Sequence, residues 1–190
     1  PDTPLYADAG GEILSGPRDL DGARKLLAES GYDGQPITLL VADDVGPLKA
    51  MGQVTHRVLR ELGCVVDFVA TDWSTVLARR ASRNPPDRGG WNIFHTTWAA
   101  PDVATPVIHL PLRTHGETAW AGWPKDEGIE ALRDRFMEAT DPEQQQKIAA
   151  EIQARAFEYL PFVPLGQVRQ PTAFRRTIEG IAHAPVPFFW

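Results

Sequence analysis

The chain has 190 residues, enough for one domain with a substantial core or for one domain and part of another. With 43% hydrophobic and 23% charged residues, its composition is that of a globular protein rather than a disordered one. The formal net charge of −6 argues against a nucleic-acid binder, which normally carries a basic face. No uninterrupted apolar run reaches the roughly 20 residues needed to cross a bilayer.

The first part of the chain predicts alternating helices and strands. Residues 1–18 contain Pro and Gly without a sustained period, so we interpret them as an extended segment. A helix capped by its first residue is expected over 19–31, and a short apolar strand over 37–43. A second helix over about 47–63 and a second strand over 64–70 follow. Strand, helix and strand joined by short connections predict a parallel βαβ unit.

The middle of the chain predicts a strand followed by a long irregular segment. A third helix over about 72–82 and a polar turn over 83–90 precede the strand Trp91–Trp98. A proline-rich loop then extends to Pro124. Loops of this length in compact domains are usually functional or disordered, and this one is too rich in Trp, Ile, Val and Leu to be disordered. We therefore expect it to line a ligand cleft.

Two helices are predicted after this loop. The first presents Ile129 and Phe136 on one face, and the second begins at Asp141 as its N-cap. Residues 160–168 (LPFVPLGQV) have the composition of an extended strand. The tail, residues 172–190, ends in the apolar stretch VPFFW. Such an end is seldom left in water, so it is predicted to pack against a partner surface.

Acidic side chains follow the predicted strands, at the edge where open α/β sheets bind ligands. Asp43, Asp44 and Asp72 could hold a cation there. We prefer the simpler interpretation, in which Asp72 caps the next helix and the other two form a turn. Asp102 is followed by irregular chain instead. For this residue a ligand role, as an acidic group beside a concave aromatic surface, is weighed equally with a structural one.

Three tryptophans lie at or beyond the end of the strand 91–98. Trp98, Trp120 and Trp123 occupy the irregular region, where aromatic side chains commonly form binding surfaces. Trp73 and Trp91, by contrast, belong to a predicted helix and a predicted strand start. They are interpreted as packing residues.

No catalytic motif is present. The five histidines show no metal-ligand spacing, and there is no nucleophile elbow, Walker loop or dinucleotide glycine motif. The single Cys64 excludes an intrachain disulfide and is predicted to be a buried, inert thiol. We expect a protein that is not an enzyme and uses no cofactor or metal. A metal-dependent hydrolase or transferase using the acidic strand ends stays open as the alternative, with a signalling module presented to a receptor as a third interpretation.

Four stretches carry a resemblance to a known family by their order and spacing. They are DLDGARKLLAESGYDGQPITLLVADD (19–44), RELGCVVDFVATDWSTVL (60–77), WNIFHTTWAAPD (91–102) and EGIEALRDRFMEATDPEQQQKIAAEIQARAFEYLPFVPLG (127–166). Taken together, they resemble family 5 of the extracytoplasmic solute-binding proteins, the dipeptide- and oligopeptide-binding components of ABC importers. The individual motifs are loose, but the resemblance covers nearly the whole chain.

The resemblance implies a fold and a division of the chain. It implies an α/β lobe like that of type II periplasmic binding proteins, with a mixed, mostly parallel sheet flanked by helices. Family members are longer, so the chain would correspond to their C-terminal part. Residues 1–18 would be a leading hinge segment, 19–160 the ligand-binding lobe, and 161–190 a return hinge strand and tail directed towards the N-terminal lobe.

The resemblance also implies a function. A peptide or similar small solute would bind between two lobes that close on it, and ABC permease transmembrane subunits would receive it. The protein would be a monomer in the periplasm or on a lipid anchor outside the cytoplasm. Peptide is the family default, while some members carry nickel, sugars, opines or other solutes. With half of the cleft absent, this chain alone would bind weakly.

The family pattern finally implies site residues. After the strand, a Trp flanks the ligand and an Asp three residues later pairs with the peptide's amino terminus. Trp98 fits the first position, whereas Pro101 occupies the second and Asp102 follows it. Either the loop is shifted by one residue or the ligand has no amino terminus. The expected ligand-binding residues are His95, Thr97, Trp98, Ala99, Ala100, Asp102, Trp120 and Trp123.

Overall fold

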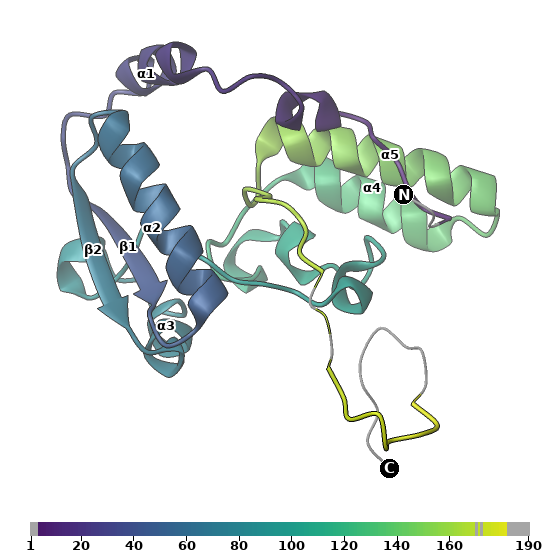
Figure 1. The fold of residues 1–190 in the computed structure, drawn as a ribbon. Coiled ribbons are helices and arrows are strands. Elements are labelled where there is room, and N and C mark those ends of the chain that lie inside the picture. The colour runs from purple at the N-terminus through teal and green to yellow at the C-terminus, as the bar shows by residue number, and fades with distance from the viewer. Residues whose placement is uncertain (1–3, 170, 172, 182–190) are drawn as a thin grey trace. The chain divides into compact units, whose positions relative to one another are not determined.

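The computed structural model describes residues 4–169, 171 and 173–181, so the VPFFW end of the predicted tail lies outside the described residues. The chain forms two compact units (Figure 1). One comprises Ser15–Thr97, and the other joins the N-terminal residues up to Leu14 to those from Trp98 onward. The expected hinge and lobe divisions stay predictions. None of the described helices is long and apolar enough to cross a membrane.

The unit Ser15–Thr97 is built on a three-stranded parallel sheet in the order β2-β1-β3. β1 (Ile37–Ala42) lies in the centre and pairs along its whole length with β2 (Val66–Thr71). Five of its six residues are buried, which explains why its sequence is a continuous apolar run rather than an alternating one. The predicted parallel βαβ unit and the α/β fold class are confirmed.

Helices flank this sheet. Asp19 accepts a hydrogen bond from the Gly22 amide at 2.8 Å, and Asp72 accepts one from the Thr75 amide at 3.0 Å. Both predicted N-caps are therefore confirmed. The helices of the unit are α1 (Leu20–Glu29), α2 (Gly46–Glu61) and α3 (Trp73–Arg79).

Helix α2 approaches the sheet closely at Gly52. A Cβ atom at this position would lie 2.6 Å and 2.7 Å from the two γ-methyl carbons of Val41, which is itself 1% exposed. No side chain fits in that space. The close approach therefore requires glycine here, although glycine in a helix interior costs about 1 kcal/mol relative to alanine.

The strand predicted over Trp91–Trp98 is much shorter in the structure. β3 comprises only Ile93–Phe94 and pairs with β1 at Leu39 and Leu40. Just before it, the Asn92 side chain takes the place of a backbone partner and accepts a hydrogen bond from the Thr38 amide at 2.8 Å. Apolar composition predicted the strand, but β3 has a neighbouring strand on one side only, and its pairing ends after two residues.

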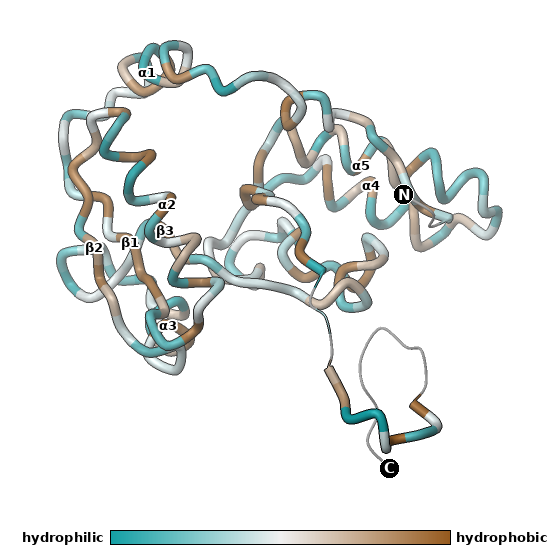
Figure 2. The backbone as a smooth tube through the Cα atoms, in the orientation of Figure 1, coloured by the Kyte–Doolittle hydropathy of each residue, from teal (hydrophilic) through white to brown (hydrophobic). Residues whose placement is uncertain are grey.

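The other unit is organised around two helices that lie side by side (Figure 1). They are α4 (Glu127–Glu138), capped by Asp126, and α5 (Pro142–Tyr159), capped by Asp141 as predicted. Hydrophobic and hydrophilic stretches alternate along both (Figure 2). Their apolar faces form one buried cluster, which contains Leu112, Ile129, Phe136, Ala139, Ile148, Ala149 and Ile152.

Residues near the start of the described chain and residues just after α5 pack against this helix pair. The Gln153 side chain donates a hydrogen bond to the Ala9 carbonyl at 2.9 Å, just before the 3-10 helix η1 (Gly11–Leu14). At the other end, Leu160 terminates α5 in a left-handed conformation with φ of 55°. Residues 161–169, where a return strand was predicted, run without regular secondary structure. Phe162, at the start of this stretch, packs on the helical cluster.

Candidate functional site

The segment between Trp98 and Asp126 is a long loop, as predicted, and lies entirely within the α4–α5 unit. Three short 3-10 helices are its only regular secondary structure: η3 (Ala100–Val103), η4 (Leu110–Leu112) and η5 (Gly116–Thr118). We refer to residues 98–126 as the binding loop. Because almost none of its backbone pairs with a β-strand, its conformation depends on contacts made by side chains.

Two of the three loop tryptophans meet. The rings of Trp98 and Trp120 contact each other edge to face, with centroids 5.6 Å apart and planes at 69°. Trp98 is 37% exposed, so much of its ring is left for another partner. Trp123 follows in a turn closed by its amide on the Trp120 carbonyl and has a φ of 49°, which is rare for a non-glycine residue.

An open pocket of about 480 Å³ lies within the binding loop. Its wall is mainly apolar, and it also carries one carboxylate and one guanidinium. Small-molecule sites have this character, with a few polar groups on an apolar surface. The structure thus brings Trp98 and Asp102 to one pocket, while their roles in ligand binding stay predictions. The lining residues are Trp98, Pro101, Asp102, Ile108, Leu110 and Arg113.

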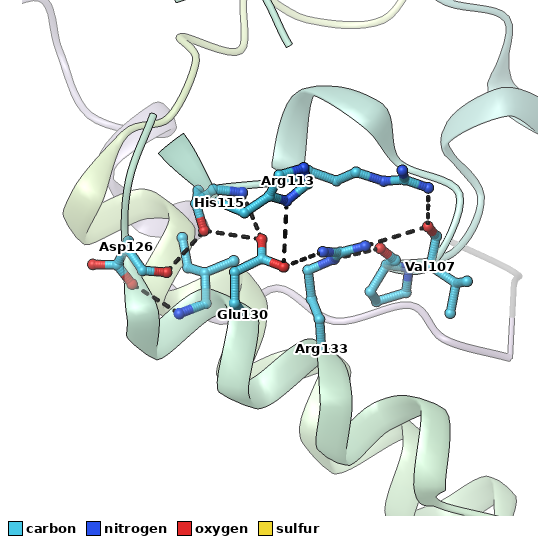
Figure 3. Close-up of polar contacts among 9 residues, drawn as sticks. Val107, Arg113, His115, Asp126, Glu130 and Arg133 are labelled. Atoms are coloured by element: carbon cyan, nitrogen blue, oxygen red, sulfur yellow. Dashed lines mark hydrogen bonds and ion pairs between the residues drawn. The ribbon is translucent and has the colours of Figure 1, made fainter. Parts of the chain in front are cut away.

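A polar network fixes the binding loop to helix α4 (Figure 3). Glu130 accepts a hydrogen bond from the Thr114 amide at 2.5 Å and pairs with Arg133 at 2.6 Å. Arg133 is only 7% exposed and also donates to the Pro106 carbonyl at 3.0 Å and, less closely, to that of Val107. Two points of the loop backbone are therefore held by neighbouring side chains of one helix.

The electrostatics of this network favour the charged carboxylates. Burial acts to raise the pKa of Glu130, but hydrogen bonds from Thr114 and the charge of Arg133 prevail and hold it below its usual value. The pKa of Asp126 is also lowered, chiefly by its hydrogen bond from Arg155 at 2.6 Å. Both carboxylates are therefore ionised at neutral pH and can anchor the ends of the loop.

The other residues expected to bind a ligand differ in their unit and in their burial. His95 and Thr97 belong to the unit Ser15–Thr97. His95 is 9% exposed, its Nε2 lies 2.8 Å from Thr55 Oγ1, and burial lowers its pKa. Thr97 is exposed, as are Ala99 and Ala100 at the start of the binding loop.

The acidic strand ends have structural partners. The Asp44 carboxylate accepts a hydrogen bond from the Trp73 amide at 2.9 Å, and Asp72 caps α3. The preferred interpretation of Asp72 as a cap is confirmed, and Asp43 and Asp44 lie in the bend between β1 and α2. Among the described residues, no group of three His, Cys, Asp or Glu side chains is placed to hold a metal ion.

Sequence reasoning missed part of the pocket and the network behind it. Ile108, Leu110 and Arg113 carry no motif that distinguishes them from other loop residues. Arg133 did leave a signal, because it lies four residues after Ile129 and three before Phe136, on the face predicted to be apolar. A charged residue in such a position indicates a buried, paired group.

Comparisons with known proteins agree on one relationship. No family model matches the chain. The chain is 35% identical over 172 residues to the protein named "Probable peptide ABC transporter periplasmic-binding protein y4tO" of Sinorhizobium fredii, covering 90% of this chain and 32% of that protein. It is 25% identical over 183 residues to "Di/tripeptide-binding protein 4" of Pseudomonas aeruginosa, covering 92% of this chain and 33% of the relative.

A solved structure shares the fold. The crystal structure of the ABC transporter substrate-binding protein CtaP from Listeria monocytogenes matches with a TM-score of 0.61 and 20% identity, over 74% of this chain and 28% of that one. The chain thus spans about a third of the length of the relatives it matches. The chain is therefore similar in sequence to part of proteins named as peptide-binding components of ABC transporters, and it shares the fold of a solved substrate-binding protein.

Proposed function

We propose that the chain forms about a third of the substrate-binding component of an ABC importer and that it binds a peptide or a similar small solute. The observation that carries the proposal is the pocket formed by Trp98 and Asp102 in a chain homologous to peptide-binding proteins. An aromatic wall beside a carboxylate suits an organic solute that carries a cationic group. In this proposal the protein works outside the cytoplasm and is not an enzyme.

The proposed mechanism is cleft closure. A solute that contacts both lobes only in the closed state has a higher affinity for that state, and it therefore shifts the hinge equilibrium towards closure. The membrane permease then recognises the closed form. The binding loop supplies one wall of the cleft, and its attachment to α4 keeps that wall preformed.

Some residues of the proposed site are supported by the pocket, and others rest on the sequence alone. Trp98 and Asp102 line the pocket, and Trp120 contacts Trp98. Ala99 and Ala100 belong to the same segment. His95, Thr97 and Trp123 are carried over from the sequence, where the first two follow the family resemblance and Trp123 its place in the irregular segment. The hydrolase alternative has no such support, because Asp44 and Asp72 are engaged by backbone amides.

Calorimetric titration of the complete protein that contains this chain tests the proposal. The panel comprises di- to pentapeptides, nickel and sugars. We expect submicromolar binding of a peptide, weakened at least about tenfold in Trp98→Ala and in Asp102→Asn, since each removes a main contact. Trp73→Phe, in the packing of the other unit, is the control and should bind normally. Tight binding of nickel or a sugar instead would replace the ligand, and binding of no panel member would overturn the proposal.

A further inference from the structure

The backbone of Lys125, near the end of the binding loop, is held by one hydroxyl of helix α5. The Lys125 amide donates a hydrogen bond to Tyr159 Oη at 2.9 Å, and Tyr159 Oη donates one to the Lys125 carbonyl, also at 2.9 Å. A phenolic hydroxyl can donate and accept at once, so a single group serves both. Because Tyr159 is the last residue of α5, this contact joins the end of that helix to the loop.

The way the loop is closed explains why Lys125 needs such a partner. His115 and Lys125 form an isolated antiparallel bridge. Two backbone hydrogen bonds between their neighbours flank the pair, Gly116 to Pro124 at 2.9 Å and Asp126 to Thr114 at 3.0 Å. In an antiparallel pair of this type, the amide and carbonyl of the paired residues point away from the opposite chain. Tyr159 binds both of these groups of Lys125, as a third strand would.

The bridge closes a small loop, residues 116–124, that carries two tryptophans. The backbone of Trp123 has a φ of 49°, in the left-handed region. Such a conformation is unfavourable for a non-glycine residue and persists where the surrounding structure holds it. The contact between Tyr159 and Lys125 lies two residues further along and contributes to that hold.

The second tryptophan of this small loop connects it to the pocket. The Trp120 ring contacts Trp98 edge to face, and Trp98 lines the pocket. We propose that Tyr159 is a positioning residue for the pocket: its hydroxyl holds residues 116–124 so that Trp120 keeps Trp98 oriented towards a solute. This inference rests on the proposed function, because the orientation of the wall matters only if the pocket receives a solute.

Circular dichroism of the complete protein without ligand tests the effect of Tyr159 on the tryptophans. Two indole rings this close couple their electronic transitions, so the difference between the spectra of the wild type and Trp120→Phe reports their contact. In Tyr159→Phe, which loses only the hydroxyl, the same Trp120→Phe difference should be smaller. Tyr32→Phe is the matched control and should leave it unchanged. In the other unit, Tyr32 Oη likewise donates to a backbone carbonyl, of Gln35, and accepts from an amide, of Val65, both at 2.9 Å.

Calorimetric titration with the tightest-binding peptide of the panel tests the effect on the pocket. Tyr159→Phe should weaken binding roughly three- to tenfold, as expected for the loss of a neutral hydrogen bond, and Tyr32→Phe should bind normally. If Tyr159→Phe lowers the urea midpoint but keeps the Trp120→Phe difference, or keeps wild-type affinity, the inference is wrong and the proposed function stands. If the wild type binds no panel member, the proposed function fails and the inference about its pocket falls with it.

Discussion

Arg133 determines where the binding loop lies more directly than any other side chain described above. It is nearly buried, it pairs with Glu130, and it donates to the backbone at Pro106 and Val107. Arg113 donates a hydrogen bond to the same Val107 carbonyl at 3.3 Å. The position of the pocket's cation therefore depends on a residue that does not itself line the pocket.

Replacing Arg133 with Met should lower the free energy of unfolding of this unit by about 2–4 kcal/mol, because the partly buried Glu130 loses its cation and the Pro106 carbonyl loses its donor. Urea unfolding followed by circular dichroism measures the change. The matched control is Arg135→Met, which breaks an exposed pair with Glu151 and should cost less than about 1 kcal/mol. Equal effects of the two substitutions would contradict the assigned role.

His109 provides a residue-scale test by pH. Its ring stacks on Phe162 with centroids 5.3 Å apart, and burial, helped by the charge of Arg133, lowers its pKa. As pH falls below the usual value of 6.5, the unfolded chain takes up this proton before the folded chain does, so stability decreases.

His109→Gln should make the free energy of unfolding less dependent on pH between pH 6.5 and the lower pKa of His109 in the folded state. Urea unfolding at several pH values, compared with the wild type, gives the slope. His56→Gln, in the other unit, serves as the control for removing a histidine. An unchanged slope in His109→Gln would show that the ring is accessible to solvent protons in the folded state.

At the scale of elements, the helices could be predicted well and the third strand could not. Caps such as Asp19, Asp72 and Asp141 are local signals, and each accepts the backbone hydrogen bond expected of it. β3 and the stretch 161–169 depend instead on whether a neighbouring strand is present to pair with. Apolar composition alone does not contain that information.

The contact between α2 and β1 gives a prediction at the same scale. Gly52→Ala should lower the free energy of unfolding by about 1–3 kcal/mol, because its methyl group would overlap Val41. In the background Val41→Ala, the added methyl should be accommodated, so the two effects should not add. Gly46→Ala, in the same helix with open space around it, should be neutral or slightly stabilising. Circular dichroism during urea unfolding distinguishes these outcomes.

At the scale of the whole molecule, the described chain consists of two units of different construction. Ser15–Thr97 is continuous in sequence and has its own parallel sheet and buried cluster, which includes Leu40, Ala42, Leu48 and Val76. The second unit needs distant parts of the chain, since Gln153 of α5 binds the Ala9 backbone. Periodicity in the sequence predicted the α-helices of both units but not this division, which arises from contacts across the chain.

We expect residues 15–97, expressed alone, to fold cooperatively. Hydrogen exchange should protect the amides of Leu39, Leu40 and Val41 most strongly, because β1 is central and buried. A fragment that starts at Trp98 should be less stable than the same fragment fused to residues 4–14, since Leu5 and Ala9 would be lost. Uniformly rapid exchange in 15–97 would contradict its independence.

The attachment of the binding loop has a consequence for how its pocket can change while the fold is kept. The loop is tied to α4 at Pro106, Val107 and Thr114, through two adjacent acidic and basic side chains of the helix. The segments before and between these points, 98–105 and 108–113, contribute the pocket wall but no part of the buried helical core apart from Leu112. With Leu112 kept, libraries confined to these segments should alter the pocket wall while the helical core keeps its packing.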